Sequence, residues 1–299
     1  MRTAGGTVGV ALLDCTSLAT SPPDLEKLFT EIRANLLEMV NEERDVERVP
    51  LVAMDDLATQ VATKHAIAMA TGEFTSHWGR DGLKPYQRYS FAGGTHATAE
   101  NISAADNTWS LKAGDLKQDA AYLHLRLYQQ KPPNDGHRRT ILAPQHTHVG
   151  FGLAVEQLRL RLVELFVAKH GEVGAVKRTA KPGEQILFTG RVSKPQHFLS
   201  YVEVLYEPVP KVPELSWLQQ PRPYSLPNES MVLRPKVPPP YKYADGSGSG
   251  IVEVSPDGIF TTPVTFFKTE PGIYTIVAWI KTSQTAKAFP ATEVCIRAE

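Results

Sequence analysis

Two histidines and one glutamate are the residues of this chain whose types and spacing could do chemistry: His77, Glu100 and His137. They lie 23 and 37 residues apart, each beside turn-forming residues, so only a fold that gathers them could make them one site. Two neutral imidazoles and a carboxylate suit a divalent metal such as zinc, and three protein ligands with an open fourth position is the arrangement of catalytic zinc sites. The same groups could instead form a hydrogen-bonded network that holds loops together, or a hydrolytic centre. The sequence leaves these interpretations open.

The sequence lacks the motifs of two hydrolase classes. The chain contains neither a His-Glu-x-x-His pair nor a Gly-x-Ser-x-Gly elbow, which mark zinc peptidases and α/β-hydrolases. Ser76 adjoins His77, but neighbouring residues of an extended segment point to opposite sides, which disfavours Ser–His catalysis. The sequence therefore does not decide whether the protein is an enzyme, and we expect no organic cofactor.

Aromatic residues accompany the histidines. Trp78 follows His77 directly, and Tyr86 lies in a short helical turn soon after it. Aromatic side chains beside a polar cleft can hold a small ligand, although ordinary core packing is the alternative. His148 opens an apolar segment and could belong to the cluster or lie at its rim. We take Trp78, Tyr86 and His148 as candidate ligand-binding residues.

The elements that must position these residues can be read from apolar periodicity. Three segments, 22–44, 55–72 and 115–130, repeat apolar residues at three- and four-residue spacing, which predicts amphipathic helices. Residues 148–155 form an apolar run, and residues 158–167 begin by alternating leucine with arginine, which predicts two strands. The first half is therefore predicted to pack helices around a small, largely antiparallel sheet.

The second half predicts strands only. Runs rich in β-branched and aromatic residues, bounded by Gly, Pro and Asp, lie at 186–190, 201–206, 249–255, 260–267 and 272–281. Ten prolines between 208 and 240 indicate an extended, exposed connection. The segment around Tyr274 resembles the tyrosine corner of immunoglobulin-like sandwiches. We predict a signal-like or disordered segment at 1–24, an α+β domain at 25–178 and a β-sandwich at 179–299 without catalytic residues.

Composition narrows the classes of partner. The 299 residues are 42% hydrophobic and 21% charged, with 32 basic and 32 acidic side chains, so no net field favours nucleic acid. No apolar run approaches the ~20 residues that a transmembrane helix requires. Met1-Arg2 and the weak apolar run at 8–13 have the layout of a secretion signal, which predicts a secreted or cell-envelope protein. Cys15 lies in a partial lipoprotein box, with Asp14 where a small residue is expected, so lipidation stays open.

Short segments of the first half recur in an order that identifies a family. They are Asn41-Glu42-Glu43-Arg44, Leu51, His65-Ala66, Met69, Phe74-Thr75-Ser76-His77, Asp81-Gly82, Pro85-Tyr86, Arg88, Glu100-Asn101-Ile102, Gly136-His137-Arg138, Ile141-Leu142 and His148-Val149-Gly150-Phe151-Gly152. None is specific alone, but their order and spacing resemble the CAP superfamily (cysteine-rich secretory, antigen 5 and pathogenesis-related 1 proteins) in its bacterial, SCP-like form.

The resemblance implies an exported α-β-α sandwich with a His/Glu cleft that can bind a divalent metal. His77, Glu100 and His137 fall on the family's first histidine, first glutamate and second histidine. The second glutamate of many relatives is missing here, because no Glu occurs between Leu116 and Gly136; Asp119 or His124 is nearest in kind.

Two functions of different class follow. In the first, the chain is an exported binding or interaction protein, whose cleft takes a divalent metal and a small apolar ligand or peptide while the sandwich docks to a cell-envelope component. The alternative is a metal-dependent peptidase or esterase of low activity. The missing glutamate and the absent nucleophile motif favour the first.

Overall fold

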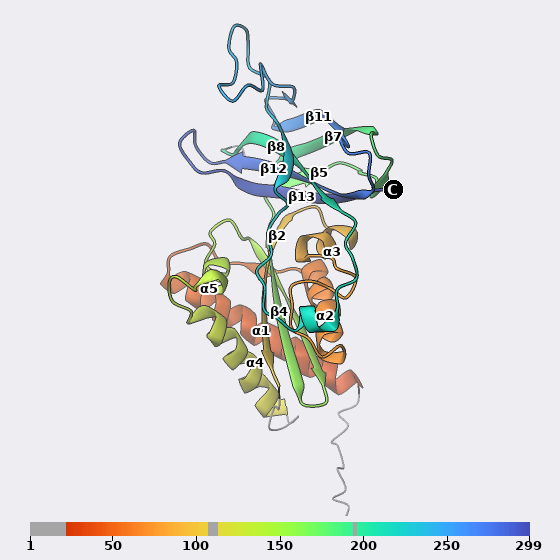
Figure 1. The fold of residues 1–299 in the computed structure, drawn as a ribbon. Helices are drawn as coiled ribbons and strands as arrows, with labels where there is room; N and C mark the ends of the chain where they lie inside the picture. The colour runs from red at the N-terminus through yellow and green to blue at the C-terminus, as the bar shows by residue number, and fades with distance from the viewer. Residues whose placement is uncertain (1–21, 107–112, 194–195) are drawn as a thin grey trace, which may run out of the picture.

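A computed structural model describes residues 22–106, 113–193 and 196–299. The predicted signal-like segment and Cys15 therefore lie outside the described residues, except for the start of the first helix. Figure 1 shows a helix-and-sheet half, drawn below, and a half built mainly of strands above it, where the chain ends. No helix of the described chain is both long and apolar enough to cross a membrane.

The first half contains one mixed sheet of four strands. Its order is β1-β3-β4-β2, in which β3 and β4 form an antiparallel hairpin, β2 runs antiparallel to β4, and β1 is parallel to β3. The strand β2 therefore lies at an edge of the sheet, which becomes important at the site. The strands are β1 (Ala53–Met54), β2 (Ala97–Ala105), β3 (His148–Glu156) and β4 (Arg159–Ala168).

Helices cover both faces of this sheet and make three layers. One face packs on an apolar cluster that includes Leu36, Leu123 and Phe151, and the other on a cluster that includes Ala62, Met69 and Leu165. The helices are α1 (Pro22–Val46), α2 (Asp56–Thr71), α3 (Pro85–Phe91), α4 (Ala113–Tyr128) and α5 (Gly136–Ile141). The predicted α+β arrangement is confirmed.

Two glycines of β3 explain how closely α2 lies on the sheet. A Cβ atom at Gly150 would come within 2.2 Å of the Thr59 backbone nitrogen, and one at Gly152 within 2.1 Å of the Ala62 carbonyl carbon. Only glycine leaves room for backbone at these distances. The Gly-Phe-Gly segment thus brings α2, and with it the chain that leads to His77, directly onto the sheet.

The second half is two sheets that share one apolar core, with Phe188 and Phe260 from one sheet and Val204 and Ile276 from the other. The orders are β6-β13-β12-β8-β9 and β10-β11-β7-β5. Their strands are β5 (Gly171–Val173), β6 (Thr179–Ala180), β7 (Gln185–Val192), β8 (Phe198–Pro208), β9 (Glu229–Leu233), β10 (Glu253–Val254), β11 (Ile259–Thr265), β12 (Gly272–Lys281) and β13 (Phe289–Ala298).

Four details differ from or refine the sequence-based expectation for this half. The long strand β13 was missed, and only Glu253–Val254 of the run at 249–255 is a strand. Because β5 pairs with β7, the sheets of the second half begin at Gly171, before the boundary expected at 178/179. Lys268 donates its backbone N–H to the Tyr274 hydroxyl at 2.6 Å, which is a contact expected of a tyrosine corner.

The two halves are joined by hydrogen bonds as well as by the chain. The Cys295 N–H donates to Ser90 Oγ at 2.7 Å, and Arg178 donates to the same hydroxyl at 2.9 Å. The Glu293 N–H donates to the Thr95 carbonyl at 2.9 Å. These contacts connect β13 with α3 and the segment before β2, the elements that carry the candidate site.

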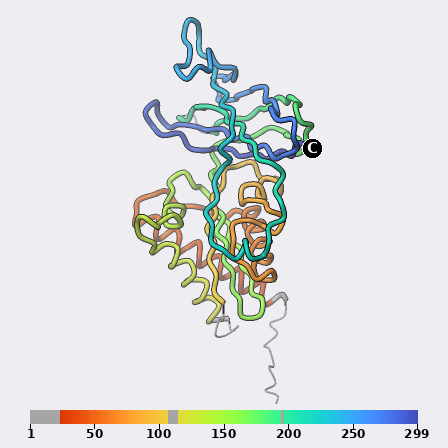
Figure 2. The backbone as a smooth tube through the Cα atoms, in the orientation of Figure 1, coloured from red at the N-terminus to blue at the C-terminus, as the bar shows by residue number. Residues whose placement is uncertain are grey.

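Most of the proline-rich segment is exposed, as its composition predicted, but part of it packs on the first half. Residues 209–228, here named the strap, leave the second half after β8, run along the first half and return to β9; Figure 2 shows this excursion in cyan. Its single helical turn is α6 (Leu215–Leu218), and Leu218 is 1% exposed within the apolar cluster of α2. Burial of the apolar side chains of Trp217 and Leu218 stabilises the contact between the strap and the first half.

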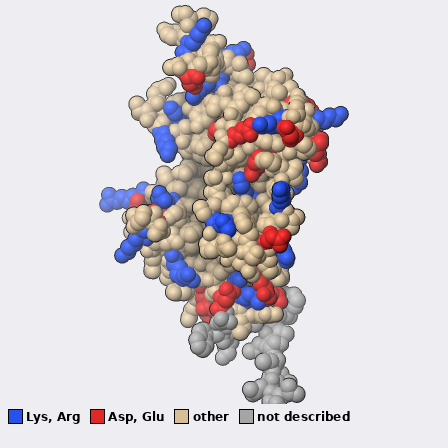
Figure 3. All heavy atoms as spheres, viewed as in Figure 1, with Lys and Arg blue, Asp and Glu red and all other residues tan. Residues whose placement is uncertain are grey.

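The face drawn in Figure 3 carries no large patch of one charge. On the face drawn in Figure 3, basic and acidic side chains are interspersed and most of the surface is uncharged. This agrees with the balance of 32 basic and 32 acidic residues in the sequence.

Candidate functional site

His77 and Glu100 meet, as predicted. Nδ1 of His77 lies 2.9 Å from Oε1 of Glu100, and the two residues are 8% and 4% exposed. His77 comes from the loop after α2, and Glu100 from the edge strand β2. Because an ionised carboxylate only accepts, His77 donates from Nδ1.

Arg88 of α3 completes this cluster. Its Nη2 lies 2.6 Å from Oε2 of Glu100, while Nη1 donates to the His77 carbonyl at 2.6 Å. Burial by itself would raise the pKa of the Glu100 carboxyl, but Arg88, followed by the neighbouring histidines, holds it at about 2. The Glu100 carboxylate is therefore ionised, and both of its oxygens have hydrogen-bond partners. The sequence analysis placed Arg88 in the family pattern without assigning it to the site.

His137 lies in a separate set of hydrogen bonds. Nε2 of the Gln130 amide lies 2.7 Å from Nδ1 of His137, and Gln130 Oε1 accepts the His137 backbone N–H at 3.3 Å. An amide nitrogen can only donate, so Nδ1 accepts, and the proton of the neutral ring lies on Nε2. Burial lowers the pKa of His137, and the nearby His77 lowers it further. No hydrogen bond of the described residues joins His137 to His77 or Glu100.

The three predicted ligands do not fit a metal ion in this arrangement. Both oxygens of Glu100 are engaged by His77 and Arg88, and Nε2 of His137 carries a proton where a metal would need a lone pair. Across the described ranges, no group of three or more His, Cys, Asp and Glu side chains is placed to hold a metal. The sequence predicted zinc at these three residues; in the arrangement described we expect none, and a titration tests this.

The residues considered as substitutes for the missing glutamate lie elsewhere. His124 of α4 is buried between two carboxylates, with Nδ1 2.6 Å from Glu164 and Nε2 3.0 Å from Glu43. Burial would lower the pKa of His124, but the two carboxylates raise it to about 10. His124 is thus an imidazolium held in a second polar cluster. In the described part of the chain, neither His124 nor Asp119 hydrogen-bonds to His77 or Glu100.

Asn101 connects this second cluster to His137. Its Nδ2 donates to Glu164 at 3.0 Å and to the His137 carbonyl at 3.2 Å. Successive residues of a strand point to opposite faces, so Glu100 and Asn101 serve the two polar clusters on opposite sides of β2. The Glu-Asn pair of the sequence pattern therefore has two positioning roles.

Tyr224 of the strap lies directly against His77. The centroids of the two rings are 4.8 Å apart, and the Tyr224 hydroxyl accepts the backbone N–H of Glu100 at 2.7 Å. Burial raises the pKa of Tyr224 well above its ordinary value, so the hydroxyl stays protonated. The sequence gives no sign of this contact, because Tyr224 lies 124 residues after Glu100 in a segment that carries no signal of its return to β2.

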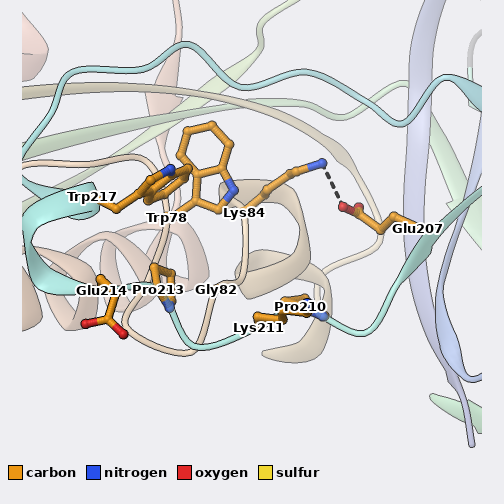
Figure 4. A pocket seen from close by; sticks show the side chains of 9 residues that line it. All are labelled: Trp78, Gly82, Lys84, Glu207, Pro210, Lys211, Pro213, Glu214 and Trp217. Atoms are coloured by element: carbon orange, nitrogen blue, oxygen red, sulfur yellow. Dashed lines mark ion pairs between the residues drawn. The ribbon is translucent and has the colours of Figure 1, made fainter.

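One of the three predicted ligand-binding residues, Trp78, lines a pocket. This pocket of about 360 Å³ lies between the loop after α2 and the strap, and Figure 4 shows its lining. The Trp78 and Trp217 rings are 5.2 Å apart at 82°, and Lys84 Nζ lies 2.8 Å from Glu207 Oε2. Its lining residues are Trp78, Gly82, Lys84, Glu207, Pro210, Lys211, Pro213, Glu214 and Trp217.

The other two predicted ligand-binding residues lie outside this pocket. Tyr86 is 2% exposed and donates its hydroxyl to Glu207 Oε1 at 2.9 Å, so it packs between the two halves. His148 lies at the start of β3 with Nδ1 2.9 Å from Thr147 Oγ1, and burial lowers its pKa. No ring contact or hydrogen bond among the described residues joins His148 to His77.

A nucleophile is not presented to the histidine. Ser76 is 2% exposed, and its hydroxyl accepts the Trp78 backbone N–H at 3.2 Å. The His77 ring is instead hydrogen-bonded to the Glu100 carboxylate. The cluster can therefore fix loops and hold charge, but it offers neither an activated hydroxyl nor an uncommitted carboxylate.

One family model matches part of the first half. Residues 37–166 match the model of the cysteine-rich secretory protein family, CAP. No curated protein matches the chain.

Solved structures give similarities of low identity. An extracellular protein containing an SCP domain from Bacillus anthracis is 21% identical, with a TM-score of 0.38, over 50% of this chain and 44% of that one. An outer surface protein from Borrelia burgdorferi is 16% identical, with a TM-score of 0.37, over 46% and 92%. A cysteine-rich secretory protein from Staphylococcus aureus is 17% identical, with a TM-score of 0.31, over 47% and 39%. The match thus spans less than half the length of the first and third of these chains.

Proposed function

Because residues 37–166 of this chain form a CAP domain, we propose that the protein is an exported binding protein that takes a small apolar ligand or peptide side chain in the pocket between Trp78 and Trp217. The pocket beside the His77 cluster is the observation that carries this proposal. Its volume of about 360 Å³ lies within the range of small-molecule sites.

The lining of the pocket favours an apolar ligand. Two indoles and two prolines supply apolar surface from the two halves of the chain. The charged groups at its far end neutralise each other, because Lys84 pairs with Glu207, which also accepts from Tyr86 and Gln87. The binding free energy of a ligand should therefore come mainly from covering the apolar surface of the indoles and prolines. A charge on the ligand should add little to it.

The polar cluster supports binding more than turnover. Hydrolysis requires a group that can accept or donate a proton at the reacting atom. Glu100 is held as a carboxylate by Arg88 and His77, and Ser76 is buried away from the ring. We therefore assign His77, Glu100 and Arg88 to a polar network that fixes the loop carrying Trp78, and leave the metal-dependent hydrolase as the alternative.

Export and the role of the second half are parts of the same proposal. The secretion-like start of the sequence and the CAP domain support a secreted or cell-envelope location. The two sheets and the Tyr274 contact support an immunoglobulin-like sandwich that docks to the cell envelope.

A neutral fluorescent probe tests the pocket. N-phenyl-1-naphthylamine should bind the full chain saturably at one site, and Trp217→Ala should weaken binding at least tenfold. Trp279→Ala is the matched control, because Trp279 is a partly buried indole stacked on Tyr201 in the other half. Equal affinity of the wild type and Trp217→Ala would remove the pocket from the proposal.

Turnover is measured on the same preparations. Peptidase and esterase substrates should show no chelator-sensitive activity above that of His77→Ala. Chelator-sensitive hydrolysis that is lost in His77→Ala would favour the metal-dependent hydrolase instead.

A further inference from the structure

The strap is far longer than the connection it makes. The strands β8 and β9 are antiparallel neighbours, which two residues can join, yet the strap spans residues 209–228 between them. The extra chain runs over the first half and ends beside His77. Its contacts there are those of a peptide in a binding site.

The end of the strap lies against the protein as an extended peptide would. Arg222, Tyr224 and Leu226 are partly buried, while Pro221, Pro223 and Ser225 between them are exposed. Alternation of this kind places every second side chain on the partner surface, which is how extended peptides are recognised.

Each inward side chain has a defined contact. The Arg222 guanidinium lies 4.7 Å from the centroid of the Trp217 ring, a contact within the strap itself, whereas the next two side chains contact the first half. The Tyr224 ring lies 4.8 Å from the His77 ring at an angle of 56°, and its hydroxyl accepts the Glu100 N–H. Leu226 packs against the apolar cluster of Leu83 and Tyr86.

The main chain of the strap is also bound. Lys84 donates from Nζ to the Ser225 carbonyl at 3.3 Å. The Glu100 N–H that Tyr224 accepts belongs to β2, an edge strand of its sheet. Without Tyr224 this edge donor would need another acceptor, which is a general reason why strand edges capture extended chains.

We propose that the groove along His77, Glu100 and Lys84 is a peptide-binding site, and that strap residues 221–226 are its built-in ligand. The class of ligand follows from the strap itself: an extended segment with a tyrosine flanked by proline and an apolar residue two positions later. A second peptide competes with the strap, whose tether gives it an effective concentration of about millimolar. The site therefore opens to another chain when the strap is displaced. This inference does not depend on what occupies the Trp78–Trp217 pocket.

A labelled peptide with the sequence of residues 220–228 tests the groove. By fluorescence anisotropy with the full chain, Tyr224→Ala should bind it at least tenfold more tightly than the wild type, because the built-in side chain no longer competes. Tyr241→Ala is the matched control, since Tyr241 is a 67% exposed tyrosine in another proline-rich loop of the second half. It should behave as the wild type does. A peptide in which the tyrosine is replaced by alanine should bind no variant.

Two further variants keep the result interpretable. Tyr224→Ala combined with His77→Ala should lose the gained affinity, because the tyrosine of the peptide no longer has the His77 ring to pack against. Tyr224→Phe retains the ring and loses only the bond to the Glu100 N–H, so it should fold and bind the peptide with intermediate affinity. If the alanine variant does not fold, Tyr224→Phe becomes the deciding variant. Peptide binding by the deciding variant that is no tighter than the wild type's would overturn the proposal, whereas probe binding in the tryptophan pocket is unaffected by that outcome.

Discussion

The Nη2 atom of Arg88 lies 2.6 Å from Oε2 of Glu100, and this buried ion pair determines what the polar cluster can do. The ion pair keeps the Glu100 carboxylate charged and engages its Oε2 atom, while His77 hydrogen-bonds to Oε1. The same arginine holds the His77 backbone through its carbonyl. Three elements far apart in the sequence are thereby fixed at one point.

Removing the cation should be costly. Arg88→Met leaves the Glu100 carboxylate buried without its main partner, and we expect the free energy of unfolding to fall by about 3–5 kcal/mol. Urea denaturation at pH 7 measures the change. Arg191→Met is the control, because its pair with Asp257 is exposed to solvent, where water screens the attraction, and its loss should have a much smaller effect. Equal effects of the two substitutions would contradict the assignment.

The Glu100 carboxyl should also make the fold sensitive to acid. Its pKa is about 2 in the folded state, below the value of about 4.3 for an unfolded glutamate. A depressed folded-state pKa stabilises above the unfolded value, and this stabilisation is lost as the pH falls from about 4.3 toward 2. Unfolding midpoints of the wild type and Glu100→Gln should therefore converge across that window. A constant gap between pH 7 and pH 3 would show that the charge of Glu100 contributes nothing.

His124 should be charged at neutral pH. Its pKa of about 10 exceeds the unfolded value of about 6.5, so its stabilisation is complete below pH 6.5 and is lost as the pH rises toward 10. At pH 8 the ring nitrogen shifts in an NMR spectrum should be those of an imidazolium. His146 is the internal control, because burial lowers its pKa to about 4 and keeps its ring neutral. A neutral His124 ring at pH 8 would refute the prediction.

Zinc should not bind tightly to the chain as it is arranged. Calorimetric titration at pH 7.5 is expected to show no stoichiometric site, since Glu100 is engaged by His77 and Arg88 and His137 carries its proton on Nε2. His77→Ala and His137→Ala serve as the reference. One equivalent of zinc bound by the wild type and lost in both variants would restore the three-residue metal site.

The two halves should fold separately when the cut respects the sheets. Residues 25–170 and 171–299 keep β5 with its partner β7, and both fragments are expected to unfold cooperatively. The first fragment should be less stable than in the full chain, because it lacks the strap. Without the strap, the apolar cluster of α2 loses Leu218 and the Glu100 N–H loses its Tyr224 acceptor. Adding the second fragment should raise its melting temperature. If neither fragment gives a cooperative transition, the halves are not independent domains.

Much of the first half could be predicted because its signals are local. Apolar spacing along α1, α2 and α4 determines which face of each helix is buried, and period-two alternation marks β4. The order of short segments indicated the family, and with it the meeting of His77 and Glu100. The second half was predicted less completely, since β13 contains Pro290 and Glu293, residue types that are uncommon inside strands.

The sequence by itself therefore indicated the three long helices and the hairpin β3–β4 of the first half, its resemblance to the CAP family, and the meeting of His77 and Glu100; it missed the strand β2 and the helix α5. Tertiary structure decided what that cluster is able to do. The pairing of Arg88 with Glu100, the amide of Gln130 on His137 and the return of Tyr224 to His77 join residues by contacts between elements, for which spacing along the chain carries no signal. The protonation state of each group depends on those contacts, because charge and burial act through space and not along the sequence.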